Sequence, residues 1–315
     1  MKISFVDIKI FLNKHGIPFQ VIGDAKENYI VASIYNPVKN GFYFLQASND
    51  IPNFSDSIIL TDFINKPFNG NVILKINESP QVVFYKILNE YFKEVSSGEV
   101  CSSSKIHNEA IIGKNVQIDS FVVIGISEIG DNSIIKSNTV INDNCKIGKN
   151  TIIESNCSIG VRGIAWVFEG QGNRVNQPQL GGVTIGENCI IGANSAIARG
   201  SLNEDTRIGD QTVIAPGAKI GHGVIISERV HLSNNVCVAG NSKIEERSFI
   251  GSGAIISSKT VIKKGTIVGA GAMVNKNFEK ENSTLIGVPA RPVKKEKRNI
   301  NKGVPATLRN IKDEE

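Results

Sequence analysis

The sequence predicts a mainly β protein in which a long coil of short strands follows a small α/β domain. Three observations carry this prediction. Apolar residues recur every six positions between residues 106 and 274, glycine or asparagine often follows them, and this spacing is missing from the first 96 residues. A spacing of six fits neither the 3.6-residue period of a helix nor the two-residue period of a simple strand.

The six-residue repeat runs in two series with an interruption between them. The first series has one step of five and comprises Ile106, Ile112, Ile118, Ile124, Ile129, Ile135, Ile141, Ile147, Ile153 and Ile159. The second has a step of five at Leu202 and comprises Ile185, Ile191, Ile197, Leu202, Ile208, Ile214, Ile220, Ile226, Leu232, Val238, Ile244, Ile250, Ile256, Ile262, Val268 and Val274. Glycine and asparagine tolerate the left-handed backbone conformations that tight corners need. Each hexad is therefore interpreted as one side of a coil.

The interruption between the two series is filled by the glycine-rich segment GVRGIAWVFEGQGNRVNQPQLGG. A segment of this length cannot lie flat in a coil, so we expect a loop that protrudes at residues 160–183. The run IAWVF is costly to expose to water, which favours a pocket wall or a subunit contact over a tolerated surface insertion. Trp166 is accordingly a candidate for sugar or nucleotide binding.

The regions that flank the repeat define the other parts of the chain. Residues 1–96 are expected to form a small α/β domain, because VVFYKILNEYFKE is helix-like and IIL and VILKI are strand-like. The Ser-rich linker VSSGEVCSSS leads into a coil domain at 104–288. A polar, basic tail occupies 289–315.

The charge distribution argues against a nucleic-acid partner. The formal net charge is +5, and the eight basic and four acidic side chains from Arg291 onward supply +4 of it, which leaves the body almost neutral. A nucleic-acid groove needs many phosphate contacts, and a neutral body does not provide them.

The cysteines and the apolar runs indicate a cytoplasmic protein without stable membrane insertion. The five cysteines are odd in number and show no CxxC spacing, so neither a disulfide framework nor a zinc site is expected. The N-terminal segment scatters charge among its apolar residues, unlike a signal peptide. No apolar run approaches the roughly 18 residues of a membrane span.

Several motifs carry a resemblance to known families. Through GFYFL, VFYKILNEYF and PQLGGVTIGENCIIGANSAIARGSL the chain resembles the UDP-3-O-acylglucosamine N-acyltransferase family of lipid A biosynthesis. Through GHGVIISERVHLSNNVCVAG, VGAGAMVNK and LIGVPARPVKK it is also similar to sugar-nucleotide acetyltransferases of the sialic-acid and bacillosamine type. These hexapeptide-repeat transferases imply a left-handed parallel β-helix with three hexads per triangular coil. They also imply a homotrimer with pockets between adjacent subunits.

The resemblance assigns roles to residues of the second series. Both families place a histidine base where His222 stands, and histidine suits proton removal because its ordinary pKa lies near the working pH. The acetyltransferases have a second histidine at the position of His231 and a glycine at that of Gly240, which makes both candidates for binding the acyl donor. Gly240 has no side chain to block a thioester, and its N–H could donate to the developing oxyanion.

The chain also departs from the lipid A family at three positions. Ala198 precedes Arg199 where that family has an aspartate, and Ala215 stands where it has a second acid. Phe44 matches the first ring of the family's uracil clamp, whereas Asp50 occupies the position of the second. Phe44 and Arg199 join Trp166 as candidate sugar- or nucleotide-binding residues.

The coil arithmetic predicts a partner for the His222 ring. Residues one coil of three hexads apart in an unbroken register stack at about the 4.8 Å spacing of neighbouring strands. Glu204 lies three hexads before His222, so we expect its carboxylate to accept a hydrogen bond from the ring and fix the tautomer as a second catalytic residue. Asp205 and Asp210 are the alternatives.

Small residues late in the chain suggest a groove for acyl-CoA. A pantetheine arm could lie against their backbone amides, with basic side chains at the phosphates. The candidates are Ala254, Gly269, Ala270, Gly271, Arg291 and Lys294.

These observations favour a cytoplasmic homotrimeric N-acyltransferase that uses acyl-CoA, without a metal, to acylate a nucleotide-linked amino sugar for cell-surface polysaccharide. The alternative is the acyl-carrier-protein-dependent UDP-3-O-acylglucosamine N-acyltransferase of lipid A biosynthesis. A hydratase of the carbonic anhydrase type would need three histidine ligands around zinc, and only two histidines fall in the relevant coils. A non-catalytic β-helical scaffold is the remaining alternative.

Overall fold

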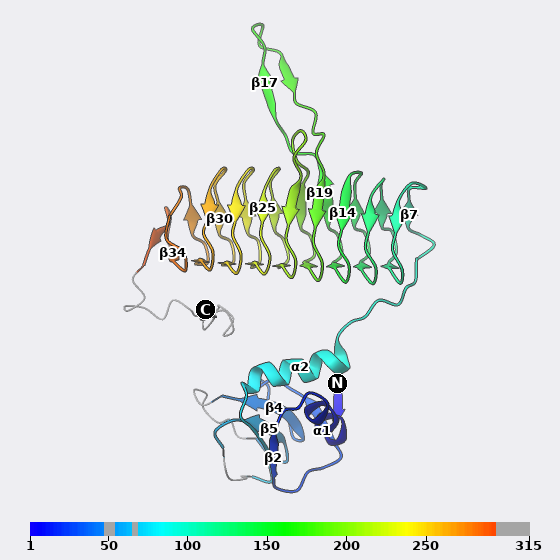
Figure 1. Cartoon of the computed structure of the whole chain (residues 1–315), viewed down its shortest axis with the longest axis vertical. Helices are drawn as coiled ribbons and strands as arrows, with labels where there is room; N and C mark the ends of the chain where they lie inside the picture. The colour runs from blue at the N-terminus through cyan, green and yellow to red at the C-terminus, as the bar shows by residue number, and fades with distance from the viewer. Residues whose placement is uncertain (47–53, 65–68, 294–315) are drawn as a thin grey trace. The chain divides into compact units, whose positions relative to one another are not determined.

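The structure is a computed structural model that describes residues 1–46, 54–64 and 69–293. The chain divides into two compact units, Met1–Glu94 and Val95–Glu315. Figure 1 labels the helices and strands of both units. Within the described ranges, no helix is both long and apolar enough to cross a membrane.

The first unit is a mixed sheet with two helices. Ser4 caps α1 (Phe5–Lys14) by accepting a hydrogen bond from the Asp7 N–H at 2.9 Å. Pro80 begins α2 (Pro80–Phe92). The first N–H groups of a helix have no partner within the helix, so the lack of an N–H in proline costs no hydrogen bond there. In sheet order the strands are β1 (Lys2–Ser4), β3 (Asn28–Val31), β4 (Gly41–Leu45), β5 (Ile58–Thr61), β6 (Val72–Ile76) and β2 (Phe19–Ile22). The four middle strands pair in parallel, and the two edge strands pair antiparallel.

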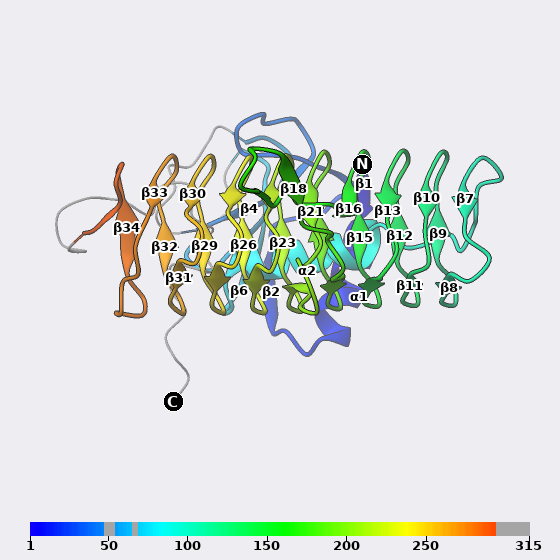
Figure 2. The same cartoon turned by 90° about the horizontal axis from the view of Figure 1, so that it is seen from above.

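The second unit is a left-handed parallel β-helix, which confirms the fold class that the six-residue repeat and the resemblance predict. Its coils follow one another in a row (Figure 2), and each coil contributes one short strand to each of three faces.

The strands of the three faces follow one another around each coil. Face I contains β7 (Lys105–Ile106), β10 (Val123–Ile124), β13 (Val140–Ile141), β16 (Ser158–Val161), β21 (Ala196–Ala198), β24 (Lys219–Ile220), β27 (Cys237–Val238), β30 (Ile255–Ile256) and β33 (Met273–Val274). Face II contains β8 (Ile111–Ile112), β11 (Glu128–Ile129), β14 (Cys145–Ile147), β19 (Val183–Ile185), β22 (Thr206–Ile208), β25 (Ile225–Ile226), β28 (Lys243–Ile244) and β31 (Val261–Ile262). Face III contains β9 (Gln117–Ile118), β12 (Ile134–Ile135), β15 (Ile152–Ile153), β20 (Ile190–Ile191), β23 (Val213–Ile214), β26 (His231–Leu232), β29 (Phe249–Ile250), β32 (Ile267–Val268), β34 (Thr284–Ile286) and β35 (Arg291–Pro292).

The repeated apolar residues form the core of the β-helix. Ile214 pairs with Leu232, and Leu232 with Ile250, so each inward side chain stacks on its equivalent in the preceding coil. All three are fully buried. The corners use residues that tolerate positive φ, among them Asn188 (56°) and Asn235 (57°). Apolar burial and the ladder hydrogen bonds between coils therefore come from the same short repeat.

Two insertions leave the β-helix at the same corner, between faces I and II. The first runs from β16 to β19 and contains the antiparallel hairpin of β17 (Trp166–Phe168) and β18 (Arg174–Asn176). This hairpin stands out from the side of the coils (Figure 1). The second is residues 199–205, between β21 and β22 on the next coil. Insertions at one corner leave all three faces continuous.

The second insertion overturns the expected inward position of Leu202. Its side chain is 49% exposed and belongs to the corner, not to the ladder. Five more residues separate Ile197 from its partner Ile220 than separate Ile208 from its partner Ile226. The additional chain therefore lies between β21 and β22, and a count of six-residue steps through this corner gives a false register.

The inward ladder predicts different costs for two neighbouring substitutions in β20. Ile191→Ala should lower the free energy of unfolding by about 2–5 kcal/mol, because Ile191 is fully buried in the core. Ile190→Ala should change it by no more than about 0.5 kcal/mol, since the Ile190 side chain is 42% exposed. Denaturant unfolding of both variants measures the difference. Equal losses would contradict the assignment of the inward face.

Candidate active site

His222 lies at the corner between faces I and II, directly after β24 and on the coil that follows the two insertions. Its ring is half-buried, and its Nδ1 is 2.9 Å from the Ser201 hydroxyl. The next residue, Gly223, is held by a hydrogen bond from its N–H to Thr206 Oγ1 at 2.9 Å. The corner therefore fixes both the backbone and one ring nitrogen of His222.

The second insertion positions Ser201. Glu204 closes the turn with its carboxylate, which accepts hydrogen bonds from the Ser201 N–H at 2.7 Å and the Leu202 N–H at 3.1 Å. Hydrogen bonds from its own N–H and from the Ser201 N–H lower the pKa of Glu204, and the charge of His222 acts in the same direction. Glu204 is thus a carboxylate committed to holding the turn that carries Ser201.

The expected hydrogen bond between Glu204 and His222 is wrong. The insertion at 199–205 breaks the register of three hexads on which the expectation rests, and Ser201 takes the place beside the ring. Asp205 instead accepts the Gly182 N–H at 2.9 Å, and Asp210 accepts the Glu187 N–H at 2.8 Å. Neither alternative acid binds His222.

The His222 ring packs against Gly240 on the following coil. A Cβ added to Gly240 would lie 2.6 Å from His222 Nε2, closer than real Cβ atoms approach. The sequence arithmetic places these residues together because the register between them is unbroken, with Ile220 paired to Val238. Only glycine leaves room for the imidazole ring at this position.

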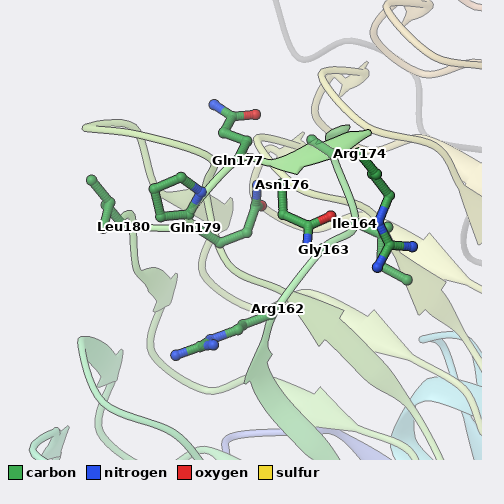
Figure 3. A pocket seen from close by; sticks show the side chains of 10 residues that line it. Arg162, Gly163, Ile164, Arg174, Asn176, Gln177, Gln179 and Leu180 are labelled. Carbon is green, nitrogen blue, oxygen red and sulfur yellow. The ribbon is translucent and has the colours of Figure 1, made fainter. Parts of the chain in front are cut away.

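A cavity of about 540 Å³ is lined by residues of the first insertion (Figure 3). It lies within the first insertion, and Arg162 and Arg174 stand on different sides of it. A Cβ on its lining residue Gly163 would lie 3.0 Å from Gln179 Oε1 and 3.6 Å from His222 Cδ2. The imidazole therefore lies close to Gly163, although His222 is not itself among the residues that line the cavity.

Two candidate sugar-binding residues of the β-helix lie close to this corner but have other contacts. The Arg199 guanidinium donates hydrogen bonds to the backbone carbonyls of Gly160, at 3.2 Å, and Asp143. It thereby ties the start of the second insertion to the two preceding coils. Trp166 is 47% exposed on β17, where its ring packs on Phe168 at 4.7 Å between centroids. Neither side chain is among the residues that line the cavity.

Phe44 belongs to the first unit. Its ring packs on Phe84 at 5.2 Å and on Tyr85 at 5.9 Å between centroids. Asp50, at the position of the second clamp ring, lies outside the described residues.

The expected donor-binding residues do not gather around His222. Only Gly240 shares its corner. His231 lies on face III, where its ring stacks on Phe249 at 5.0 Å, and burial lowers its pKa. At neutral pH it is therefore uncharged and cannot offer a cation to a phosphate.

The remaining donor candidates lie at other parts of the coils. Ala254 and Gly269–Gly271 occupy successive turns of the corner between faces III and I. Arg291 lies in β35, and its Nη1 donates to the Ala290 carbonyl at 2.8 Å. Lys294 lies outside the described residues. Within one chain, the expected acyl-CoA groove and the His222 corner are thus separate places.

The sequence reasoning missed Ser201 and Gln179 as members of the site. The spacing of 11 between Ile197 and Ile208 contained a usable signal, because it equals one hexad plus five further positions. Two insertions on successive coils at one corner indicate a built site beside the next coil. Across the described ranges, no group of three or more His, Cys, Asp or Glu could hold a metal ion.

The fold and this corner define the class: a hexapeptide-repeat β-helix with a histidine beside a loop-walled cavity. The model of the bacterial transferase hexapeptide (six repeats) matches residues 126–160, and that of the hexapeptide repeat of succinyl-transferase matches residues 182–201 and 243–276. Among solved structures, the UDP-N-acetylglucosamine acyltransferase of Francisella novicida superposes with a TM-score of 0.56 at 27% identity, over 62% of this chain and 70% of that one. The enzyme of the same name from Bacteroides fragilis gives 0.57 at 24% identity, over 62% and 74%.

Individual relatives carry a more specific name. The chain is 40% identical over 73 residues to the UDP-3-O-acylglucosamine N-acyltransferase of Shewanella denitrificans, which is 23% of this chain and 21% of that protein. It is 43% identical over 75 residues to the enzyme of that name from Bordetella petrii, which is 24% and 20%. The match thus spans about a fifth of the length of these relatives.

The close approach of Gly240 to the imidazole predicts the effect of one methyl group. Gly240→Ala should displace the His222 ring, because the new Cβ would lie 2.6 Å from Nε2. Ring proton and carbon chemical shifts of His222 should change, whereas in Gly170→Ala they should not, since nothing lies within 4 Å of a Cβ at Gly170. Unchanged His222 shifts in Gly240→Ala would contradict the described packing.

Proposed function

We propose that this chain is an N-acyltransferase that moves an acyl group from a thioester to the amine of a nucleotide-linked amino sugar, with His222 as the general base. One observation carries the proposal. Ser201 holds His222 at Nδ1, and Nε2 has no hydrogen-bond partner among the described residues, while the ring lies close to Gly163 of the cavity wall. A base needs this combination of a fixed ring and an accessible nitrogen.

The proposed chemistry assigns a step to each of these groups. The amine nitrogen attacks the thioester carbonyl, and His222 Nε2 takes the amine proton as the carbon–nitrogen bond forms. The tautomer with a proton on Nδ1 donates to Ser201 Oγ, which leaves Nε2 as the acceptor. When the carbon–sulfur bond breaks, the imidazolium returns the proton to the leaving thiolate.

The Gly240 N–H is available for the negative charge of the tetrahedral intermediate. In the part of the chain that the structure describes, this N–H donates to no protein acceptor. A backbone donor fixed beside the base can stabilise an oxyanion without reorganisation. Gly240 therefore serves both by the space it leaves and by the hydrogen bond it offers.

For the acceptor, the named relatives favour UDP-3-O-acylglucosamine, the alternative that the sequence left open. The separation of the expected acyl-CoA residues from the His222 corner also gives no support to a CoA groove within one chain. We therefore propose an acyl carrier protein thioester as the donor. The proposal includes a homotrimer, whose neighbouring subunit would cover exposed apolar side chains of the first insertion such as Ile164, Val167 and Phe168.

Removal of the proposed base tests the function directly. His222→Ala should lower the rate of acyl transfer to UDP-3-O-acylglucosamine by about 10²- to 10⁴-fold, the usual contribution of a general base. Product formation is measured by mass spectrometry with acyl carrier protein and CoA thioesters in parallel. His107→Ala, an exposed histidine of the first coil, is the control and should leave the rate unchanged. If the chain is a non-catalytic scaffold, neither the wild-type protein nor the His222→Ala and His107→Ala variants will transfer an acyl group.

A further inference from the structure

Gln179 is a buried polar side chain that the protein leaves unsatisfied. It is 94% buried, as 6% of its surface is exposed, and neither its Oε1 nor its Nε2 has a hydrogen-bond partner among the described residues. Native proteins pair nearly all buried side-chain polar atoms, because an unpaired one keeps the cost of leaving water. A whole carboxamide without partners therefore indicates that a ligand supplies them.

The position of Gln179 connects this carboxamide to the active site. Gln179 lines the cavity of about 540 Å³, and its Oε1 and the His222 ring approach the same face of Gly163. The Leu180 N–H, one residue on, donates to the Ser201 carbonyl at 3.0 Å. The segment that carries Gln179 is therefore attached to the turn that holds the base.

Other unsatisfied polar atoms lack this context. Ser195 Oγ and Thr266 Oγ1 are the further buried side-chain atoms without a partner in the described ranges, and neither residue lines the cavity. Gln177 does line it and lies two residues from Gln179, but its side chain is only half-buried and can reach water.

The hydrogen-bonding chemistry of the carboxamide restricts the ligand group. A carboxamide offers both donors and an acceptor, so it is satisfied by a group that also donates and accepts. A sugar hydroxyl or a neutral amine meets this requirement. A phosphate or a thioester carbonyl only accepts and would leave Oε1 unpaired.

The charges of the cavity restrict the ligand further. Arg162 and Arg174 line it, and neither guanidinium has an ion-pair partner within the described part of the chain. In a nucleotide sugar the diphosphate is attached directly to the sugar ring, so one cavity can accommodate both. In a pantetheine thioester a long arm separates the phosphate from the reacting carbon.

We propose that Gln179 is a positioning residue for the acceptor: its carboxamide pairs with a hydroxyl or the amine of the amino sugar and holds the sugar beside His222. This inference rests on the proposed function and names which substrate the cavity receives. No protein group among the described residues pairs with this amide, so its hydrogen bonds to the sugar would replace none within the protein.

Steady-state kinetics of Gln179→Met test the inference, since methionine has similar length and no amide. The KM for UDP-3-O-acylglucosamine should rise about 10- to 100-fold, with kcat and the KM for the thioester within about twofold. The melting temperature should not fall, because the variant removes a polar group that has no partner. The matched control Gln171→Met, at an exposed glutamine of the first insertion that does not line the cavity, should leave all of these values unchanged.

Three outcomes would overturn the role of Gln179. The first is an unchanged KM for the acceptor. The second is a rise confined to the KM for the thioester, which would assign the amide to the pantetheine arm. The third is a fall in melting temperature together with a rise in both KM values, which would make the role of Gln179 structural. Calorimetric measurement of UDP-glucosamine binding distinguishes a failure of the Gln179 proposal from a failure of the proposed function. If the wild-type protein binds UDP-glucosamine, Gln179→Met weakens that binding and neither protein consumes a thioester, then the transferase proposal fails and the sugar site stands. If the wild-type protein does not bind UDP-glucosamine, the sugar site itself is wrong.

Discussion

The structure depends on the backbone ladder between successive coils. Each coil hydrogen-bonds to the next and places one inward Ile, Leu or Val on each face directly above its predecessor, as in the stack of Ile214, Leu232 and Ile250. The polar backbone and the apolar core are therefore satisfied by the same register. An insertion within a strand would break both, whereas an insertion at a corner breaks neither. Both long insertions of this chain accordingly lie where the coil turns.

The candidate active site follows from this constraint. Both insertions leave at the corner between faces I and II, on successive coils, and His222 occupies the same corner one coil later. The first insertion forms the cavity, and the second carries Ser201 to the ring. On the other side the unbroken register brings Gly240 to Nε2. A regular scaffold thus supplies one wall of the site and two irregular segments supply the rest.

The fold could be predicted from the sequence because the six-residue spacing repeats many times, and one error does not obscure it. The contact between His222 and Gly240 was also predictable, since no insertion separates them. Glu204 was placed wrongly because Leu202 happens to fit a five-residue step, although it lies in the corner.

The expected donor residues show another limit. They were chosen from the resemblance and their small size, and neither says which corner a residue occupies. Steps of three hexads from His222 reach Gly240 but neither Ala254 nor Gly269, which lie at a different corner. Gln179 could not have been found at all, because its significance lies in partners that are missing.

The choice of a hydroxyl instead of an acid beside His222 has a chemical consequence. A carboxylate would accept from Nδ1 in every state, whereas the Ser201 hydroxyl can donate or accept, so it favours neither neutral tautomer by charge. In the proposed transfer, the imidazolium would then be left without a direct ion pair. Glu204 lies near enough for the charge of His222 to lower its pKa, but its oxygens are used by backbone N–H groups. This arrangement gives the positive ring partial compensation at a distance, which suits a charge that must exist only until the leaving thiolate takes the proton.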